Sequence, residues 1–159
     1  MKLRSISALL RYHEGECFLA YDDATGALIQ PGDTVIGHPT IGYGRALDTN
    51  GVSREEAELL LRHDIRRVTE QLTKRLPWLG ALTAPRRAVV VCMGYNLGVK
   101  GLLKFRKTLL AIERQDYRTA AVEMLSSKWA EQVGDRALML AAMMDTGHWP
   151  DDDDGEATA

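Results

Sequence analysis

The sequence predicts an α+β fold that is mainly α-helical, with a small antiparallel sheet lobe followed by a larger helical lobe. Residues 17–43 consist of short apolar runs separated by turn residues, which is the pattern of a small antiparallel sheet. From residue 53 to residue 149, apolar residues instead recur at helical spacing. Residues 88–97 are hydrophobic on nearly every face, so they predict a buried helix at the core of the larger lobe.

The first segment, residues 3–12, has apolar residues at helical spacing and predicts a short amphipathic helix. Gly15 is well placed to end this helix. Glu14 then lies at the carboxyl end of the helix, where the helix dipole disfavours ionisation and favours a protonated carboxyl group. The alternative is that Glu14, like Glu16, is an ordinary exposed carboxylate.

The sheet segment predicts strands at residues 18–21 and 40–43, with a turn at residues 23–26. Residues 28–29 and 34–36 are expected to pair as a hairpin across the sequence Gln30-Pro31-Gly32-Asp33, which is typical of a type II turn. Asp23 then lies at one of the turns of the sheet.

The helical segment begins with Ser53 and Glu56, which have the spacing of a capping box, after a turn at residues 48–51. Asp116 is expected to cap a later helix. We predict one domain over residues 1–150, with the sheet lobe at about 13–52 and a linking helix and helical lobe at about 53–149. The acidic residues 151–159 are predicted to be a disordered tail.

Composition limits the possible classes of protein. No apolar run reaches the roughly 18 residues that a membrane-spanning helix needs, and the amino-terminal segment lacks the features of a signal peptide. The cysteines, Cys17 and Cys92, have no metal-binding or redox spacing and are expected to be free thiols. The four histidines show no metal-binding arrangement, so we expect no metal and no cofactor.

Charge is distributed unevenly along the chain. Residues 62–118 carry 13 Lys and Arg against 4 Asp and Glu, a net charge of +9. This excess suits an anionic partner, either nucleic acid or a cell-wall polymer, although the same charges also fit the solvated faces of helices. Because the chain has no recognised DNA-reading motif and its aromatic residues are few and dispersed, we expect no nucleic acid partner.

Two carboxylates on separate backbone elements, Glu14 and Asp23, indicate acid–base chemistry. One carboxyl group can remain protonated and donate a proton, while the other remains ionised. A neighbouring hydroxyl, for which Thr40 is the candidate, can hold a water between them. This is the minimum equipment for hydrolysing a glycosidic bond.

Several motifs occur in the order and phase of a known family. Glu14-Gly15 is followed by Tyr21-x-Asp23 and by Thr40-Ile41-Gly42-Tyr43-Gly44. Further matching segments follow, namely residues 49–52, 86–88, 95–98, 105–109, 127–129 and 146–149. Over nearly the whole chain, the sequence resembles the phage-type lysozymes, the muramidases of T-even phages and the endolysins of other phages.

The resemblance implies the lysozyme-like two-lobe fold and a set of site residues. Glu14 resembles the general acid, Asp23 the carboxylate that stabilises the transition state and helps activate water, and Thr40 the residue that holds this water. Substrate contacts are implied at Tyr95 and Thr108, and Arg136 resembles an arginine that the family sets against the acid.

The chain departs from the family pattern in a longer segment between Asp23 and Thr40. Thr25 and Thr34 therefore remain alternatives to Thr40 as the residue that holds the water. Asp22 remains an alternative to Asp23, although family spacing favours Asp23. Only one of the two adjacent acids can face a cleft, because neighbouring residues of a strand point to opposite sides.

The function implied is that of a monomeric endolysin that hydrolyses the β-1,4 bond between N-acetylmuramic acid and N-acetylglucosamine in the glycan strands of peptidoglycan, lysing the host cell. The resemblance further implies accumulation in the host cytoplasm and a holin-like membrane pore as the partner that gives access to the wall. The alternatives are a lytic transglycosylase acting on the same bond and a non-catalytic module that binds an anionic polymer.

Overall fold

The structure is a computed structural model that describes residues 5–150. The chain divides into two compact units, with unit 1 ending at Leu59 and unit 2 beginning at Leu60. The division falls within helix α3 (Arg54–Arg75), the helix that we expected to link the two lobes. A single domain over residues 1–150 stays a prediction, and the predicted tail lies outside the described residues.

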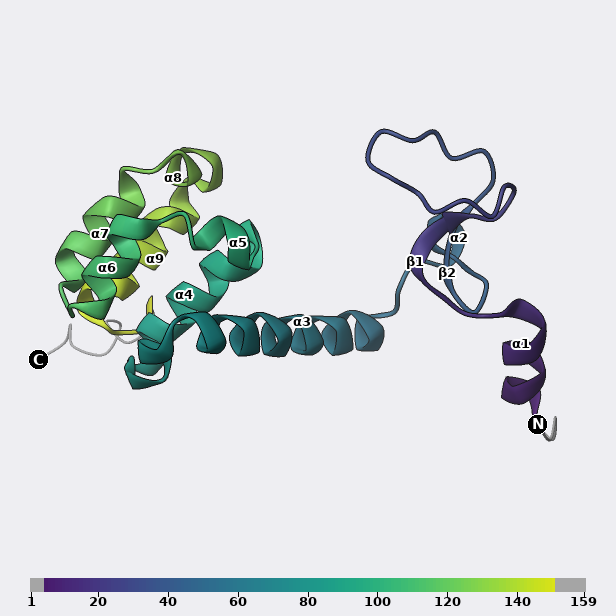
Figure 1. Cartoon of the computed structure of the whole chain (residues 1–159), viewed down its shortest axis with the longest axis horizontal. Helices are drawn as coiled ribbons and strands as arrows, with labels where there is room; N and C mark the ends of the chain where they lie inside the picture. The colour runs from purple at the N-terminus through teal and green to yellow at the C-terminus, as the bar shows by residue number, and fades with distance from the viewer. Residues whose placement is uncertain (1–4, 151–159) are drawn as a thin grey trace, which may run out of the picture. The chain divides into compact units, whose positions relative to one another are not determined.

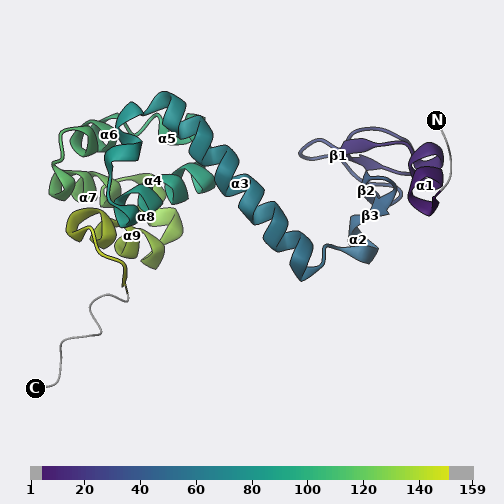
Figure 2. The same ribbon diagram turned by 90° about the horizontal axis from the view of Figure 1, so that it is seen from below.

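Unit 1 contains a small sheet and short helices (Figure 2). Its described elements are α1 (Ile6–Glu14), β1 (Cys17–Asp22), β2 (Pro39–Gly42), β3 (Arg45–Ala46), α2 (Leu47–Asn50) and the first turns of α3. The strands form an antiparallel sheet in the order β1-β2-β3. Together with the helices of unit 2, this sheet confirms the predicted α+β, mainly α-helical fold class.

Helix α1 begins and ends at capping residues of its own sequence. The Ser5 side chain accepts a hydrogen bond from the Ala8 amide at 3.1 Å, which satisfies one of the free N–H groups of the first turn. Gly15 follows the last helical residue with a φ of 67°, a conformation that costs glycine little. The predicted short helix therefore forms, over Ile6–Glu14 and not over residues 3–12, and it ends before Gly15 as predicted.

The predicted hairpin across residues 30–33 does not form. Leu28 instead bridges Tyr21 of β1, so the chain turns back on β1 directly after the turn at residues 23–25. Asp33 does close a turn with Gln30, because their main chains bond at 3.0 Å and the Asp33 carboxylate accepts from the Gln30 amide at 2.8 Å. Residues 34–36 form no strand, since the Ile36 amide bonds to a side chain, as described below.

The capping box at the start of α3 forms as predicted. The Ser53 amide donates to Glu56 Oε2 at 2.7 Å, and the Glu56 amide donates to Ser53 Oγ at 3.2 Å. The turn predicted at residues 48–51 is instead largely the short helix α2.

Unit 2 is a group of helices, of which α4–α9 lie close together in both views (Figures 1 and 2). After α3 come η1 (Pro77–Ala81), α4 (Ala84–Leu97), α5 (Val99–Leu102), α6 (Arg106–Glu113), α7 (Tyr117–Leu125), α8 (Lys128–Val133) and α9 (Asp135–Thr146). The Asp116 side chain caps α7 as predicted, accepting from the Thr119 amide at 3.1 Å.

The hydrophobic core lies in unit 2. Every buried apolar residue of the described chain lies between Val68 and Met144, and α4 contributes Val89, Val90 and Met93, as its apolar sequence predicts. Helix α3 packs closely on α4 at Gly94, where an added Cβ would lie 2.8 Å from Leu72 Cδ1. Among residues 5–150, no helix combines the length and apolar character that crossing a bilayer requires.

Candidate active site

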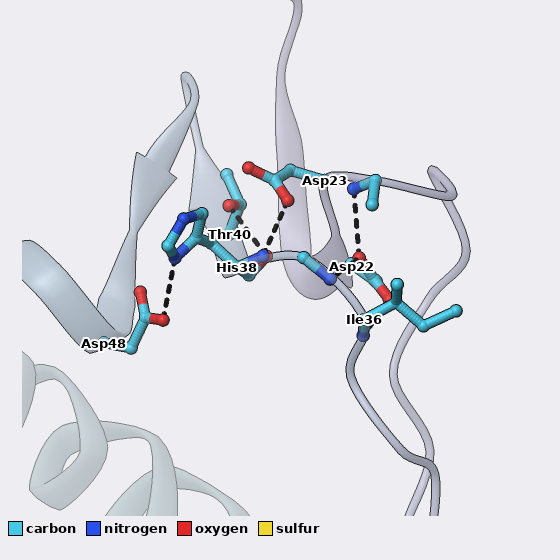
Figure 3. A network of polar contacts seen from close by, with 8 residues as sticks. Asp22, Asp23, Ile36, His38, Thr40 and Asp48 are labelled. Carbon is cyan, nitrogen blue, oxygen red and sulfur yellow. Dashed lines mark hydrogen bonds and ion pairs between the residues drawn. The ribbon is translucent and has the colours of Figure 1, made fainter.

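Asp22, the last residue of β1, is a buried carboxylate fully engaged with the main chain. It accepts hydrogen bonds from the amides of Ile36 at 2.8 Å, Gly37 at 3.0 Å and Ala24 at 3.0 Å (Figure 3). The bond from Ile36 is the main reason that the pKa of Asp22 lies below its usual value, and burial opposes it. Asp22 is 5% exposed, so it serves to fold the long loop between β1 and β2.

Asp23 is exposed, and within the described part of the chain its hydrogen bonds are to His38 alone. The His38 amide donates to Asp23 Oδ1 at 2.6 Å, and the Asp23 amide donates to the His38 carbonyl oxygen at 3.1 Å. Gly37 allows this approach, because an added Cβ at Gly37 would overlap Asp23 Oδ1. The two adjacent acids therefore differ: Asp22 is inside the loop, and Asp23 presents its carboxylate at the surface.

Thr40, in β2, lies beside the same residue. Its hydroxyl donates to the His38 carbonyl oxygen at 3.1 Å, and the residue is 3% exposed. Because the hydroxyl proton is used in this bond, the lone pairs of Oγ1 remain as acceptors. The alternative Thr25 is engaged elsewhere, since its hydroxyl accepts from the Ala27 amide at 3.2 Å. The main chain of residue 38 thus brings Asp23 and Thr40 together (Figure 3).

Glu14 lies exposed at the end of α1, and its carboxylate faces the main chain of Gly44, where an added Cβ would lie 2.7 Å from Oε2. A side chain at position 44 would therefore collide with the Glu14 carboxylate. Within residues 5–150, the Glu14 side chain makes no hydrogen bond or ion pair. The nearby Glu16 differs, because it accepts a hydrogen bond from the Tyr43 hydroxyl at 2.8 Å.

The side chain of His38 forms an ion pair that sequence reasoning missed. Nδ1 of the ring lies 2.8 Å from Asp48 Oδ2 of α2 (Figure 3). The hydrogen bond and the charge of Asp48, with a smaller effect of Asp23, raise the pKa of His38 above its usual value. The same hydrogen bond lowers the pKa of Asp48. No motif links positions 38 and 48, so the sequence carried no signal for this pair.

Arg45 joins the end of the sheet to the start of α3. Its Nε donates to the Gly51 carbonyl oxygen at 2.7 Å, and its Nη1 donates to Glu56 Oε1 at 2.6 Å. Glu56 is therefore both the second member of the capping box and the partner of Arg45. These contacts fix the course of the chain that carries Asp48.

The two residues expected to contact substrate, Tyr95 and Thr108, and the arginine expected to lie against the acid, Arg136, are all in unit 2, where they line two separate hollows. Tyr95 and Arg136 line a largely apolar hollow of about 670 Å³ between α3, α4 and α9. Thr108, which is 2% exposed, lines a hollow of about 400 Å³ with Lys104, Arg106 and other residues at the start of α6. The structure therefore brings Tyr95 and Arg136 together and places Thr108 apart from them.

Within unit 1, the arrangement provides an exposed carboxyl group at the end of a helix, a second carboxylate held by a main-chain amide, and a hydroxyl with free lone pairs. Such groups can donate a proton, accept a proton and hold a water. Among residues 5–150, no group of three or more His, Cys, Asp or Glu side chains could hold a metal ion.

The chain is similar to known proteins over most of its length. The family model described as "Phage lysozyme" matches residues 14–142. "Probable T4-type lysozyme 1" of Dictyostelium discoideum is 26% identical, in an alignment that covers 90% of this chain and 95% of that protein. "Probable T4-type lysozyme 2" of the same organism is 22% identical with the same coverage.

Proposed function

This chain belongs to the phage lysozyme family and is a glycoside hydrolase acting on peptidoglycan, and we propose that it cleaves the β-1,4 bond between N-acetylmuramic acid and N-acetylglucosamine. The observation that carries the proposal is the pairing of Asp23 and Thr40 on His38, with a free Glu14 in the same unit. The sequence resemblance to the family implies catalytic roles for the same three residues.

In the proposed mechanism, Glu14 protonates the oxygen of the leaving sugar. The Thr40 hydroxyl accepts a hydrogen bond from a water, and Asp23 removes a proton from the same water as it attacks the anomeric carbon. Asp23 also stabilises the positive charge that develops on the sugar ring. With the acid and the water on opposite faces of the sugar, the product has the inverted anomeric configuration.

The test compares Glu14→Gln, Asp23→Asn and Thr40→Ala with wild type on purified peptidoglycan. We expect Glu14→Gln to lower the rate by roughly 10²–10⁴-fold, because an amide cannot donate the proton that the leaving oxygen needs. Asp23→Asn and Thr40→Ala are also expected to cause large losses. Circular dichroism checks that each variant is folded.

Glu16→Gln is the matched control, since Glu16 lies two residues from Glu14 but is bonded to Tyr43. It is expected to keep the wild-type rate. Near-wild-type activity in Glu14→Gln would rule out the acid assignment.

Mass spectrometry of the released sugars identifies the reaction, because hydrolysis adds one water to the new reducing end, whereas a transglycosylase leaves a 1,6-anhydro sugar.

We further propose that the protein acts as a monomeric endolysin, held in the host cytoplasm until a holin-like pore gives it access to the wall. The family to which the chain belongs supports this part. Expression in a Gram-negative host, with and without a co-expressed holin, tests it. Lysis that needs the holin is the expected result, and lysis without it would contradict the proposal.

A further inference from the structure

Residue 38 is the point at which the two water-handling groups of the proposed site meet. Its amide holds Asp23 Oδ1 at 2.6 Å, and its carbonyl oxygen accepts the Thr40 hydroxyl at 3.1 Å. The same carbonyl oxygen also accepts the Asp23 amide. A shift of the main chain at residue 38 would therefore turn the Asp23 carboxylate and release the Thr40 hydroxyl at the same time.

The side chain of His38 is anchored to a different element. Its ring bonds to Asp48 at 2.8 Å, and α2, which carries Asp48, follows β3 directly. The two side chains are 52% and 43% exposed, so the pair contributes little to the free energy of unfolding. Loss of this exposed pair is therefore expected to change the position of residue 38 more than the free energy of unfolding of the protein.

We propose that His38 is a positioning residue for the hydrolysis, with its ion pair to Asp48 fixing the peptide groups that orient Asp23 and Thr40. This inference rests on the proposed function, because it assigns His38 a role through those two residues. His38 itself does not touch the reacting atoms in this role.

If the ion pair between His38 and Asp48 positions the site, the rate of hydrolysis depends on the protonation of His38. The charged groups that act on the ring are Asp48 from α2 and Asp23 at the end of β1, and both favour the protonated ring. A histidine with a raised pKa keeps its ion pair at low pH and loses it as the pH rises through that raised value. The rate constant kcat is therefore expected to fall on the alkaline side as His38 loses its proton.

The test measures kcat and KM on soluble glycan fragments across pH for Asp48→Asn and His38→Gln, together with the NMR titration of the His38 ring. We expect Asp48→Asn to lower kcat roughly tenfold near neutral pH, because small displacements of catalytic groups have such effects. KM is expected to change by less than about twofold, since no substrate contact is removed.

In Asp48→Asn, the alkaline fall of kcat and the titration of the ring should both move to lower pH. In His38→Gln, the fall that reports on the ring should disappear. Asp64→Asn is the control, because it removes an exposed ion pair with Arg67, at 2.6 Å, that has no hydrogen bond to Asp23 or Thr40. Its kcat profile should match wild type.

Four results would overturn the proposal. One is a ring titration that moves in Asp48→Asn while the kcat profile stays in place, and another is the same change of profile in Asp64→Asn. If Asp23→Asn is inactive while Asp48→Asn and His38→Gln match wild type, the positioning role alone is wrong. If Asp23→Asn is fully active, the proposed site is wrong and the role of His38 falls with it.

Discussion

The two units of this protein are stabilised by different forces. In unit 2 the buried residues are almost all apolar, and they form one core from Val68 to Met144. In the described part of unit 1, the buried residues are Asp22 and Thr40, both polar and both hydrogen-bonded. Unit 2 thus depends on removing apolar surface from water, whereas the loop that carries the candidate site depends on particular hydrogen bonds.

This difference bears on how the protein tolerates change. A core of many apolar contacts loses stability in proportion to the volume removed. A loop held by a few directed bonds changes shape when one of them is lost. Substitutions in unit 2 are therefore expected to affect mainly stability, and substitutions around Asp22 and His38 are expected to affect mainly the geometry of the site.

The largest expected effect on stability comes from truncating the core with Leu72→Ala. Leu72 is fully buried where α3 packs on α4, so its loss should lower the free energy of unfolding by about 2–5 kcal/mol. Chemical denaturation measures this change. Leu60→Ala, on the same helix but 52% exposed, is the control and should cost less than about 0.5 kcal/mol. Equal costs for the two variants would contradict the packing described for α3.

In unit 1, the next largest effect is expected from Gly37→Ala. The added Cβ would overlap Asp23 Oδ1 and lie 2.8 Å from the Ala24 amide nitrogen, so the Asp23 carboxylate must move. We expect kcat to fall by up to roughly a hundredfold, with a smaller change in Tm than Leu72→Ala causes. Gly80→Ala is the control, because an added Cβ there meets no atom within 4 Å. A Gly37→Ala enzyme with wild-type kcat would show that this approach is not needed.

A smaller effect is expected from the titration of Asp22. Its folded-state pKa is lowered, chiefly by the Ile36 amide, so its contribution to stability is present above the unfolded pKa of about 3.9 and is lost as the pH falls through the lower folded value. Asp22→Asn should lower Tm by several degrees near neutral pH and flatten the dependence of Tm on pH in the acid range. Thermal denaturation at several pH values measures both.

The activities of Asp22→Asn and Asp23→Asn distinguish the roles of the two adjacent acids. Asp22→Asn should cause only a mild loss of rate well below its Tm, whereas Asp23→Asn should cause a large one. If Asp22→Asn abolishes activity while the protein remains folded, the catalytic carboxylate has been assigned to the wrong residue.

Local signals in the sequence were sufficient for much of the fold. Gly15 at the end of α1, the capping box of Ser53 and Glu56, and Asp116 before α7 all act as predicted. Each of these features depends on residues within one turn of one another, so short-range spacing contains the information. The buried helix α4 was predictable for the same reason, because its apolar character is a property of the segment itself.

The hairpin expected across residues 30–33 failed because the sequence offered two partners for the same segment. Leu28 pairs with Tyr21 of β1, and the amides of Ile36 and Gly37 bond to the Asp22 carboxylate instead of to a strand. A carboxylate that accepts several main-chain amides replaces a strand partner, and periodicity cannot reveal such a competition.

The sequence by itself determined the end of α1, the starts of α3 and α7, the buried helix α4 and the motifs that contain Glu14, Asp23 and Thr40. Tertiary structure alone decided which of two neighbouring aspartates turns inward, and that His38 meets Asp48. The physical reason is the separation along the chain of the groups that interact. Helix ends and apolar faces are set by neighbours along the chain, whereas the bonds to residues 36–38 join groups about fifteen positions apart and exist only once the loop has closed.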